Sequence, residues 1–325
     1  MTESDPNIQP GEGEASEPRK SRKKKGAPGA TPHGAAQPVP KAGTRKVRPP
    51  KLYYQRFDGY SRFLHLLVII SFLSLAVTGM TIKFSGVGAF QTLSKILGGY
   101  EVTGFIHRFA AVITFLYFTL HIYYVQRRMR RAKMRFIELL KGENTLLPQK
   151  HDLVEFVQTI KWFLGLGPRP AYGRWTYWEK FDYLAVFWGV LVIGLSGLFL
   201  WFPERFTALG IPGWMVNVAT IIHSDEALLA TGFIFTVHFF NTHFRPDRFP
   251  MDPVIFTGSV EVEELKEDRP RMYEALVKSG ELEKGLVDAP HPLLEKWARA
   301  FGLTALTIGL ITVVMIIYSM VFLYQ

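Results

Sequence analysis

The sequence predicts an all-α integral membrane protein, a transmembrane bundle of about five helices behind a disordered N-terminal tail. Five apolar segments approach the roughly 20 residues that a helix needs to cross a bilayer. They are 63–82, 105–125, 181–202, 219–240 and 303–324. Hydrophobic residues make up 48% of the 325, although the first fifty are polar. Five histidines lie within the apolar stretches, which indicates a function for the bundle.

Composition divides the chain into four parts. Residues 1–50 are rich in Pro, Gly, Ala, Lys and Ser and include the basic run 19–25. Such a segment buries too little apolar surface to order itself, so we expect a disordered, basic, cytoplasmic tail. We expect a four-helix core in 51–250, a cytoplasmic extension in 251–300, and a fifth transmembrane helix in 301–325.

Lysine and arginine predict the orientation of the helices. The segments 1–62, 126–180 and 241–302 carry thirteen, twelve and nine of them, whereas 83–104 and 203–218 carry two and one. Cytoplasmic loops of membrane proteins are enriched in these residues. We therefore expect the N-terminus in the cytoplasm and the C-terminus outside.

Composition also excludes several classes of site. The chain has no cysteine, so disulfides, thiolate-bound iron–sulfur clusters and covalent c-type haem are excluded. The net charge of +10 follows the membrane topology, and we expect no nucleic-acid partner.

Four of the histidines form two helix-spaced pairs. His107 and His121 are fourteen residues apart, and His223 and His238 are fifteen apart. These separations are close to four helical turns, about 21 Å, which places one imidazole near each surface of a bilayer. Ionisable side chains inside a membrane are costly and usually functional, and imidazole is a common axial ligand of haem iron. Histidines that only fill a core are the competing interpretation.

The predicted topology sorts the histidines by depth. His107 and His223 lie near the outer face and form one pair directly. The inner level has three candidates for two axial positions: His65, His121 and His238. His243 follows His238 by five residues and is expected on another face of the helix, rotated by about 140°. Three further histidines are expected at the surface: His33, His151 and His291.

Four segments carry distinctive motifs: R-F-D-G-Y-S-R-F-L-H-L-L-V-I-I-S-F-L-S-L-A-V-T-G at 56–79, I-H-R at 106–108, G-R-W-T-Y-W-E-K at 173–180, and the I-H…V-H pattern of 219–240. Together they resemble the dihaem cytochrome b subunit of membrane-bound formate dehydrogenases, whose layout the membrane anchors of nickel–iron hydrogenases share. The resemblance covers roughly 52–250.

The resemblance implies two b-type haems in a bacterial inner membrane. Carried over by position, the outer haem has His107 and His223 as ligands, and the inner haem has His65 and His238. The sequence departs from the family in the fifteen-residue spacing of the helix at 219–240 and in the additional helix at 303–324.

His121 has no role in that family and is the alternative inner ligand. Cytochrome b of quinol–cytochrome c complexes takes all four ligands from two helices, and that layout would pair His121 with His238. The longer motif around His65 favours His65.

Arginines and glycines beside the spans suit haem but have ordinary uses too. Arg62, Arg108 and Arg127 would pair with haem propionates or extend to the lipid headgroups. Small residues let helices or a macrocycle approach closely. Those of interest are Gly79, Gly104, Gly194, Gly197 and Gly232.

The resembled family binds quinone at the inner face, beside the segment that enters the helix at 181–202. Tyr177 and Lys180 offer hydrogen-bond donors there, and Glu179 and Asp182 offer carboxylates for proton exchange. An interfacial aromatic belt is the alternative interpretation of this segment. Near the outer face, Asp225 and Glu226 would serve a second quinone site or cap a helix N-terminus.

The resulting hypothesis is a dihaem cytochrome b that exchanges electrons between the menaquinone or ubiquinone pool and a periplasmic redox subunit. The segment 245–280 resembles the cytoplasmic extension of bacterial cytochromes b encoded beside multihaem c-type cytochromes. The expected partner is therefore a multihaem cytochrome c, or else an iron–sulfur protein or dehydrogenase. The alternatives are a self-contained transmembrane b-type reductase and a non-haem transporter or structural membrane protein.

Overall fold

The computed structural model describes residues 51–142 and 144–322, so the tail expected at 1–50 lies outside the described residues. Five helices in these ranges are long and apolar enough to cross a membrane, which confirms the predicted fold class. They are α1 (Gly59–Lys83), α3 (Tyr100–Ala132), α6 (Tyr177–Trp201), α8 with its continuation (Met215–Phe244) and α13 (Pro292–Phe322).

Each spanning helix begins before the apolar segment that predicted it, because capping and polar residues extend its first turns. The Asp58 carboxylate accepts a hydrogen bond from the Ser61 amide and caps α1. Thr176 and Glu179 form a capping box at the start of α6. Polar residues likewise precede the apolar part of α13, which begins at Pro292 instead of 303.

The helix that carries His223 and His238 changes its winding near its end. The α-helical part of α8 ends at Phe233, and two π-helical turns follow, η1 (Ile234–His238) and η2 (Phe240–Phe244). A π-turn bonds residue i to i+5 and so accommodates one more residue than an α-turn. This winding decides where the side chains of the helix point.

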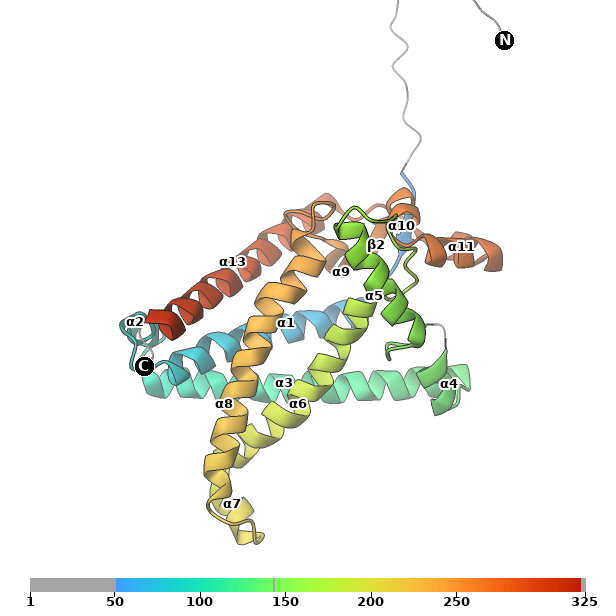
Figure 1. Ribbon diagram of the computed structural model, residues 1–325. Coiled ribbons are helices and arrows are strands. Elements are labelled where there is room, and N and C mark those ends of the chain that lie inside the picture. Colours follow the sequence, from blue (N-terminus) through green and yellow to red (C-terminus); the bar gives the residue numbers. More distant parts are fainter. Residues whose placement is uncertain (1–50, 143, 323–325) are drawn as a thin grey trace, which may run out of the picture. The chain divides into compact units, whose positions relative to one another are not determined.

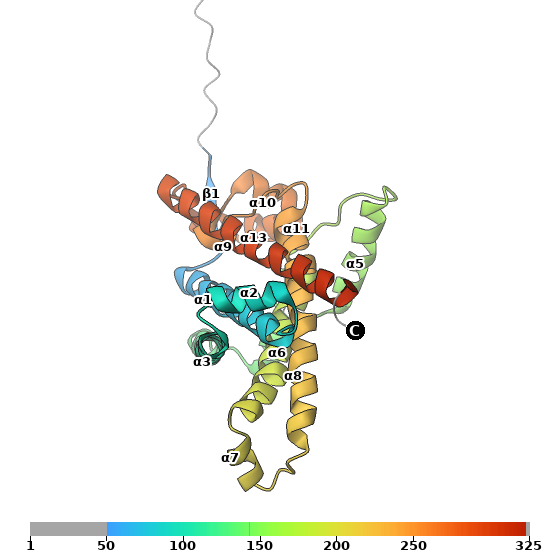
Figure 2. The ribbon, with the colours of Figure 1, turned by 90° about the vertical axis from the view of Figure 1, so that its left-hand side faces the viewer.

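Two helical pairs form the bundle, since α1 packs along α3 and α6 along α8. The two pairs cross steeply, as Figures 1 and 2 show. Helix α13 lies against α1 and η1. A side chain at Gly309 would meet the rings of Phe235 and Phe239 at 2.7 Å, so this glycine allows α13 to approach η1 closely.

The polar extension, by contrast, contains strands that the sequence pattern did not predict. Strands β1 (Tyr53–Gln55), β2 (Ser259–Glu261) and β3 (Leu286–Val287) form an antiparallel sheet in the order β2-β1-β3. Strands of two or three residues are too short for a recognisable alternation. The sheet joins the segment before α1 to the extension.

Short helices complete the described structure. They are α2 (Gly88–Ile96), α4 (Phe136–Lys141), α5 (Lys150–Phe163), α7 (Pro203–Ala208), α9 (Val254–Thr257), α10 (Val262–Asp268), α11 (Pro270–Ser279) and α12 (Glu281–Lys284). We call the end of the bundle where α6 begins and the extension lies the extension end. The other end, which carries α2 and α7, is the opposite end (Figure 1).

Ion pairs attach the extension to the bundle. Arg269 donates to both carboxylate oxygens of Glu179, at 2.9 and 3.0 Å, and Arg56 donates to the same carboxylate at 2.8 Å. Asp268 pairs with Arg248 at 3.0 Å and with other arginines around it. Burial alone would raise the pKa of Asp268, but these arginines outweigh it and hold the pKa well below its usual range.

Candidate functional site

Helices α3 and α8 bring two imidazoles close together towards the opposite end. The ring centroids of His107 and His223 are 6.1 Å apart and their planes are inclined by 80°. The His223 Nδ1 lies 2.9 Å from the Ile193 carbonyl oxygen. Because that oxygen only accepts, the proton is on Nδ1 and Nε2 keeps a free lone pair.

His107 is held in the same way by a hydroxyl group. Its Nδ1 lies 2.9 Å from the Thr78 Oγ1, and that hydroxyl donates its own proton to the Ser74 carbonyl oxygen at 2.5 Å. The Thr78 oxygen therefore accepts from Nδ1 of His107, which leaves Nε2 of this ring with a lone pair as well.

Two glycines make room for these rings. A Cβ atom at Gly79 would lie 3.2 Å from the His107 Cε1, and one at Gly197 would lie 2.9 Å from the His223 Cε1. The backbones of α1 and α6 therefore lie directly against the two imidazoles, where a side chain would not fit. The other three glycines of interest do not touch either ring: Gly104, Gly194 and Gly232.

The geometry of this pair fits a metal ion between the rings. Metal–imidazole bonds are about 2 Å long, and each ring adds roughly 1 Å, so the two centroids should be about 6 Å apart. Ligating histidines usually donate their other nitrogen to a protein acceptor, as His107 and His223 do. No group of three or more metal-ligating side chains occurs in 51–142 and 144–322. Two axial imidazoles alone suit an ion such as haem iron, which brings its remaining ligands with it.

A second group of histidines lies at the extension end. His238 donates from Nδ1 to the Asp182 carboxylate at 2.8 Å, which again leaves Nε2 with a lone pair. His65 is close enough to His238 and His243 to interact with both electrostatically. Neither ring nitrogen of His65 has a hydrogen-bond partner among the described residues, and its ring meets Phe256 edge-on at 6.3 Å.

The predicted orientation of His243 is wrong. It was expected on another face of the helix, but its ring centroid lies 6.4 Å from that of His238. The cause is the π-helical winding of η1 and η2, which makes residues five apart neighbours. The His243 Nδ1 accepts from the Asp252 amide at 3.2 Å, so in the neutral ring Nε2 carries the proton. In His107, His223 and His238, by contrast, the proton is on Nδ1.

The same winding explains the fifteen-residue spacing of His223 and His238. In a regular α-helix fifteen residues end roughly 60° beyond a whole number of turns, and fourteen end about 40° short of one. The π-turn at Ile234–His238 absorbs one residue. It therefore returns His238 towards the face that a fourteen-residue spacing would occupy.

His121 faces a different neighbour. Its Nε2 lies 2.9 Å from the Tyr183 hydroxyl, and its ring packs on the rings of Tyr183 and Phe187 in α6. The nitrogen that would bind iron is therefore occupied by a hydrogen bond. None of the ring contacts found for His121 in the described residues involves another histidine.

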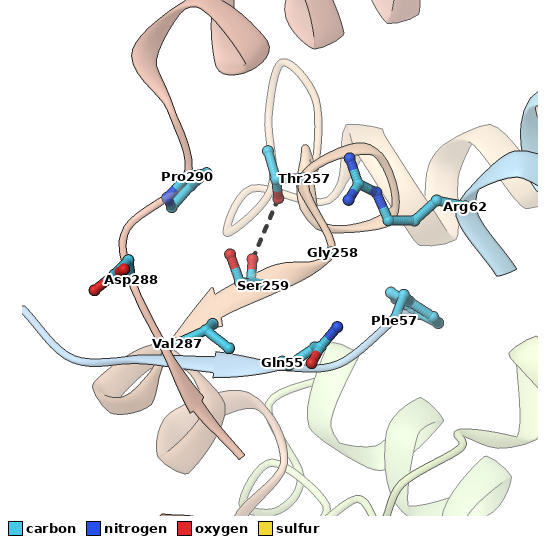
Figure 3. Close-up of a pocket in the computed structure, with 9 residues that line it drawn as sticks. All are labelled: Gln55, Phe57, Arg62, Thr257, Gly258, Ser259, Val287, Asp288 and Pro290. Atoms are coloured by element: carbon cyan, nitrogen blue, oxygen red, sulfur yellow. Dashed lines mark hydrogen bonds between the residues drawn. The ribbon is translucent and has the colours of Figure 1, made fainter. Parts of the chain in front are cut away.

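The arginines beside the histidines have different environments. Arg108 and Arg127 are exposed on α3. Arg62 lies one turn before His65, and its Nε donates to the Phe256 carbonyl oxygen at 2.7 Å. Arg62 also lines a pocket of about 190 Å³ between the start of α1 and the sheet, with its guanidinium beside Gly258 (Figure 3).

The four candidate quinone contacts do not converge on one point. Glu179 is bound by two arginines. Lys180 is buried and donates to both oxygens of Asp152 at 2.9 Å. Asp182 accepts from His238, and Tyr177 packs on Phe156 and Trp178. Neighbouring residues on a helix point about 100° apart, which explains the divergence.

The two carboxylates that follow His223 have separate partners. Asp225 is mostly exposed and pairs with Lys83 at 3.0 Å, and Glu226 accepts from the Trp188 indole at 3.3 Å. Two of the remaining histidines are described by the structure: His151 is partly exposed beside Asp152, and His291 is exposed. His33 lies outside the described residues.

Sequence reasoning missed three residues that hold candidate site residues in place. Thr78 binds His107 and Ile193 binds His223, and Asp152 binds Lys180. Thr78 lies immediately before Gly79 in the motif at 56–79, which was a usable signal. Ile193 contributes only a backbone oxygen, so no side-chain pattern could identify it.

Comparison with known proteins identifies a family. A family model described as prokaryotic cytochrome b561 matches residues 56–246, which is more than half of the chain. No curated protein matches the chain.

Proposed function

Because the chain belongs to the prokaryotic cytochrome b561 family, we propose that it carries electrons across the membrane through two b-type haems. Members of the family are membrane proteins that bind b-type haem, which argues against a non-haem transporter. The opposed rings of His107 and His223 are the observation that carries the proposal. In both rings a hydrogen bond holds Nδ1, which leaves the lone pair of Nε2 free, and a glycine lies against each ring.

The second haem is assigned to His65 and His238. His238 presents Nε2 because its Nδ1 donates to Asp182, and both ring nitrogens of His65 lack partners in the described part of the chain. The rival histidines are less suited. His121 uses Nε2 for Tyr183, and His243 accepts a backbone hydrogen bond at Nδ1.

A bound haem would supply one-electron redox chemistry at each histidine pair. The surroundings supplied by the chain differ between the two pairs. His107 and His223 donate to a hydroxyl and a carbonyl oxygen, both neutral, whereas His238 donates to the Asp182 carboxylate. The negative charge of a carboxylate bound to a ligating histidine would stabilise the oxidised state of a bound haem iron, which is the more positive one. Asp182 is thus a positioning residue that would make a haem held by His238 harder to reduce than the same haem without this carboxylate.

Quinone exchange and the redox partner are placed at opposite ends. The excess of Lys and Arg in the segments at the extension end supports a cytoplasmic location for it. We assign quinone exchange to this end and the periplasmic redox subunit to the opposite end. The ion pairs of Glu179 and Lys180 favour a structural role for those two side chains, so Tyr177 and Asp182 remain the candidates for contact with quinone.

The direct test is the haem content of purified variants. The protein should contain two b-type haems with low-spin, bis-histidine spectra. His107→Ala or His223→Ala should remove one haem, His65→Ala should remove the other, and His121→Ala should keep both. His291→Ala, an exposed histidine, is the matched control. A preparation without a Soret band would overturn the proposal, and haem loss in His121→Ala would move the second site to that residue.

A further inference from the structure

Helix α5 (Lys150–Phe163) turns a polar stripe towards the protein. Asp152, Glu155 and Thr159 are 6%, 4% and 3% exposed, and they follow one another at the three- and four-residue spacing of a single helix face. All three are polar. Helices on the surface of soluble proteins bury the opposite kind of face.

Each residue of this stripe has a specific partner elsewhere in the chain. Asp152 accepts from Lys180 of α6 through both oxygens at 2.9 Å. Glu155 accepts from Arg271 of α11 at 2.6 Å, and the Thr159 and Tyr172 hydroxyls lie 2.7 Å apart. These contacts fix the rotation of α5 about its axis, so the outward orientation of its other face is determined.

The outward face is mostly apolar, with Gln158 and Lys161 as its exposed polar residues. Its apolar side chains are between 43% and 68% exposed: Leu153, Val154, Phe156, Val157, Ile160, Phe163 and Leu164. A contiguous apolar face of this kind marks a surface that is covered in the working protein.

We propose that α5 lies in the membrane interface at the extension end, with this face among the lipid acyl chains. Fourteen residues make a helix of about 21 Å, too short to cross a core of about 30 Å, so α5 lies within one leaflet. It packs against α6, a spanning helix, which places it beside the bilayer.

Charge complementarity selects lipid as the occupant. The last two turns of α3, the segment that follows and the first residue of α5 are strongly basic: Arg127, Arg128, Arg130, Arg131, Lys133, Arg135, Lys141 and Lys150. Basic residues beside an interfacial helix attract anionic headgroups. The inference is independent of haem binding, since it needs only the membrane character of the chain.

The absence of cysteine makes a clean test available. Single cysteines at Val157 and Ile160 would be spin-labelled in the full-length protein, reconstituted in phosphatidylcholine–phosphatidylglycerol vesicles. Collision rates with oxygen and with a water-soluble nickel chelate report lipid and water, respectively. Leu195→Cys, on the exposed face of α6, is the lipid control, and Lys278→Cys, exposed on α11, is the water control.

Labels at both α5 positions should behave like the Leu195 control, accessible to oxygen and protected from nickel. Nickel accessibility equal to that at Lys278 would show that α5 lies in water and overturn the proposal. Protection from both reagents would also overturn it, because a protein partner or a second copy would then cover the face. Two neighbouring outward positions guard against a local effect of either substitution.

Discussion

The pair Lys180–Asp152 offers a sharp test of whether a conspicuous charged residue serves quinone or structure. Lys180→Met removes the cation and keeps the length of the side chain. The two side chains are 2% and 7% exposed, so the remaining Asp152 carboxylate would stay buried without its counter-charge. Breaking a buried ion pair on one side costs about 3–5 kcal/mol. The Gln149 amide still donates to Asp152, so we expect the lower end of that range, about 3 kcal/mol.

Removing both charges should largely restore stability. A buried pair replaced by apolar residues of similar size is often neutral. Lys180→Met with Asp152→Leu also loses the hydrogen bond to Gln149 at the start of α5, which is worth about 1 kcal/mol. The double variant should therefore lie within about 1–2 kcal/mol of the natural protein.

The assay is reversible unfolding in mixed micelles with increasing dodecyl sulfate, followed by circular dichroism. Lys278→Met, an exposed lysine on α11, is the control and should change little. A double variant as unstable as Lys180→Met alone would refute the ion-pair reasoning. A stable Lys180→Met protein with slow quinone-linked electron transfer would instead make Lys180 a quinone contact.

Three further predictions follow from the packing, the hydrogen bonds and the ion pairs. Gly197→Val should displace the imidazole of His223 and remove one haem. Gly232→Val is the control, because a side chain there would meet no atom within 4 Å, and it should keep both haems. Pyridine haemochrome spectra measure the haem content. Asp182→Asn should keep both haems and raise the midpoint potential of one by about 65 mV. This is the one-electron equivalent of about 1.5 kcal/mol, the lower end for a hydrogen bond to a charged group. Asp182→Glu should restore the potential, and equal redox titration curves for Asp182→Asn and the natural protein would contradict the role. Because the pKa of Asp268 is depressed, the stability that its carboxylate contributes should be complete above about pH 4 and be lost as the pH falls further. Amide protection factors in 259–287, which correct the hydrogen-exchange rates for the intrinsic effect of pH, should therefore fall on acidification.

Much of the fold was predictable from local pattern. Apolar segments marked all five spans, because the cost of exposing polar groups to lipid acts on every residue of a spanning helix. The motifs at 56–79 and 173–180 were sufficient to indicate the family. The strands β1 to β3 were missed, since their pairing joins residues more than two hundred positions apart.

The candidate site was likewise predictable only in part. The predicted topology of the helices paired His107 with His223. The structure adds that their ring centroids lie 6.1 Å apart and that both Nδ1 atoms are held by hydrogen bonds. Spacing placed His243 on the wrong face, because no sequence signal announced the π-turns. The pattern also suggested Glu179 as a proton carrier, whereas two arginines from distant segments hold it.

The five apolar spans and the charge of the segments between them could be read from the sequence alone. These properties are local, because they depend on the hydrophobicity of each segment and on the fixed rise of a helix. Which imidazoles lie opposite one another, and which ring nitrogen each one leaves free, depends on how the helices pack. The packing also decided that α5 turns its polar face inward to Lys180 and its apolar face outward. Those outcomes depend on partners far along the chain, whose positions are set when the helices pack.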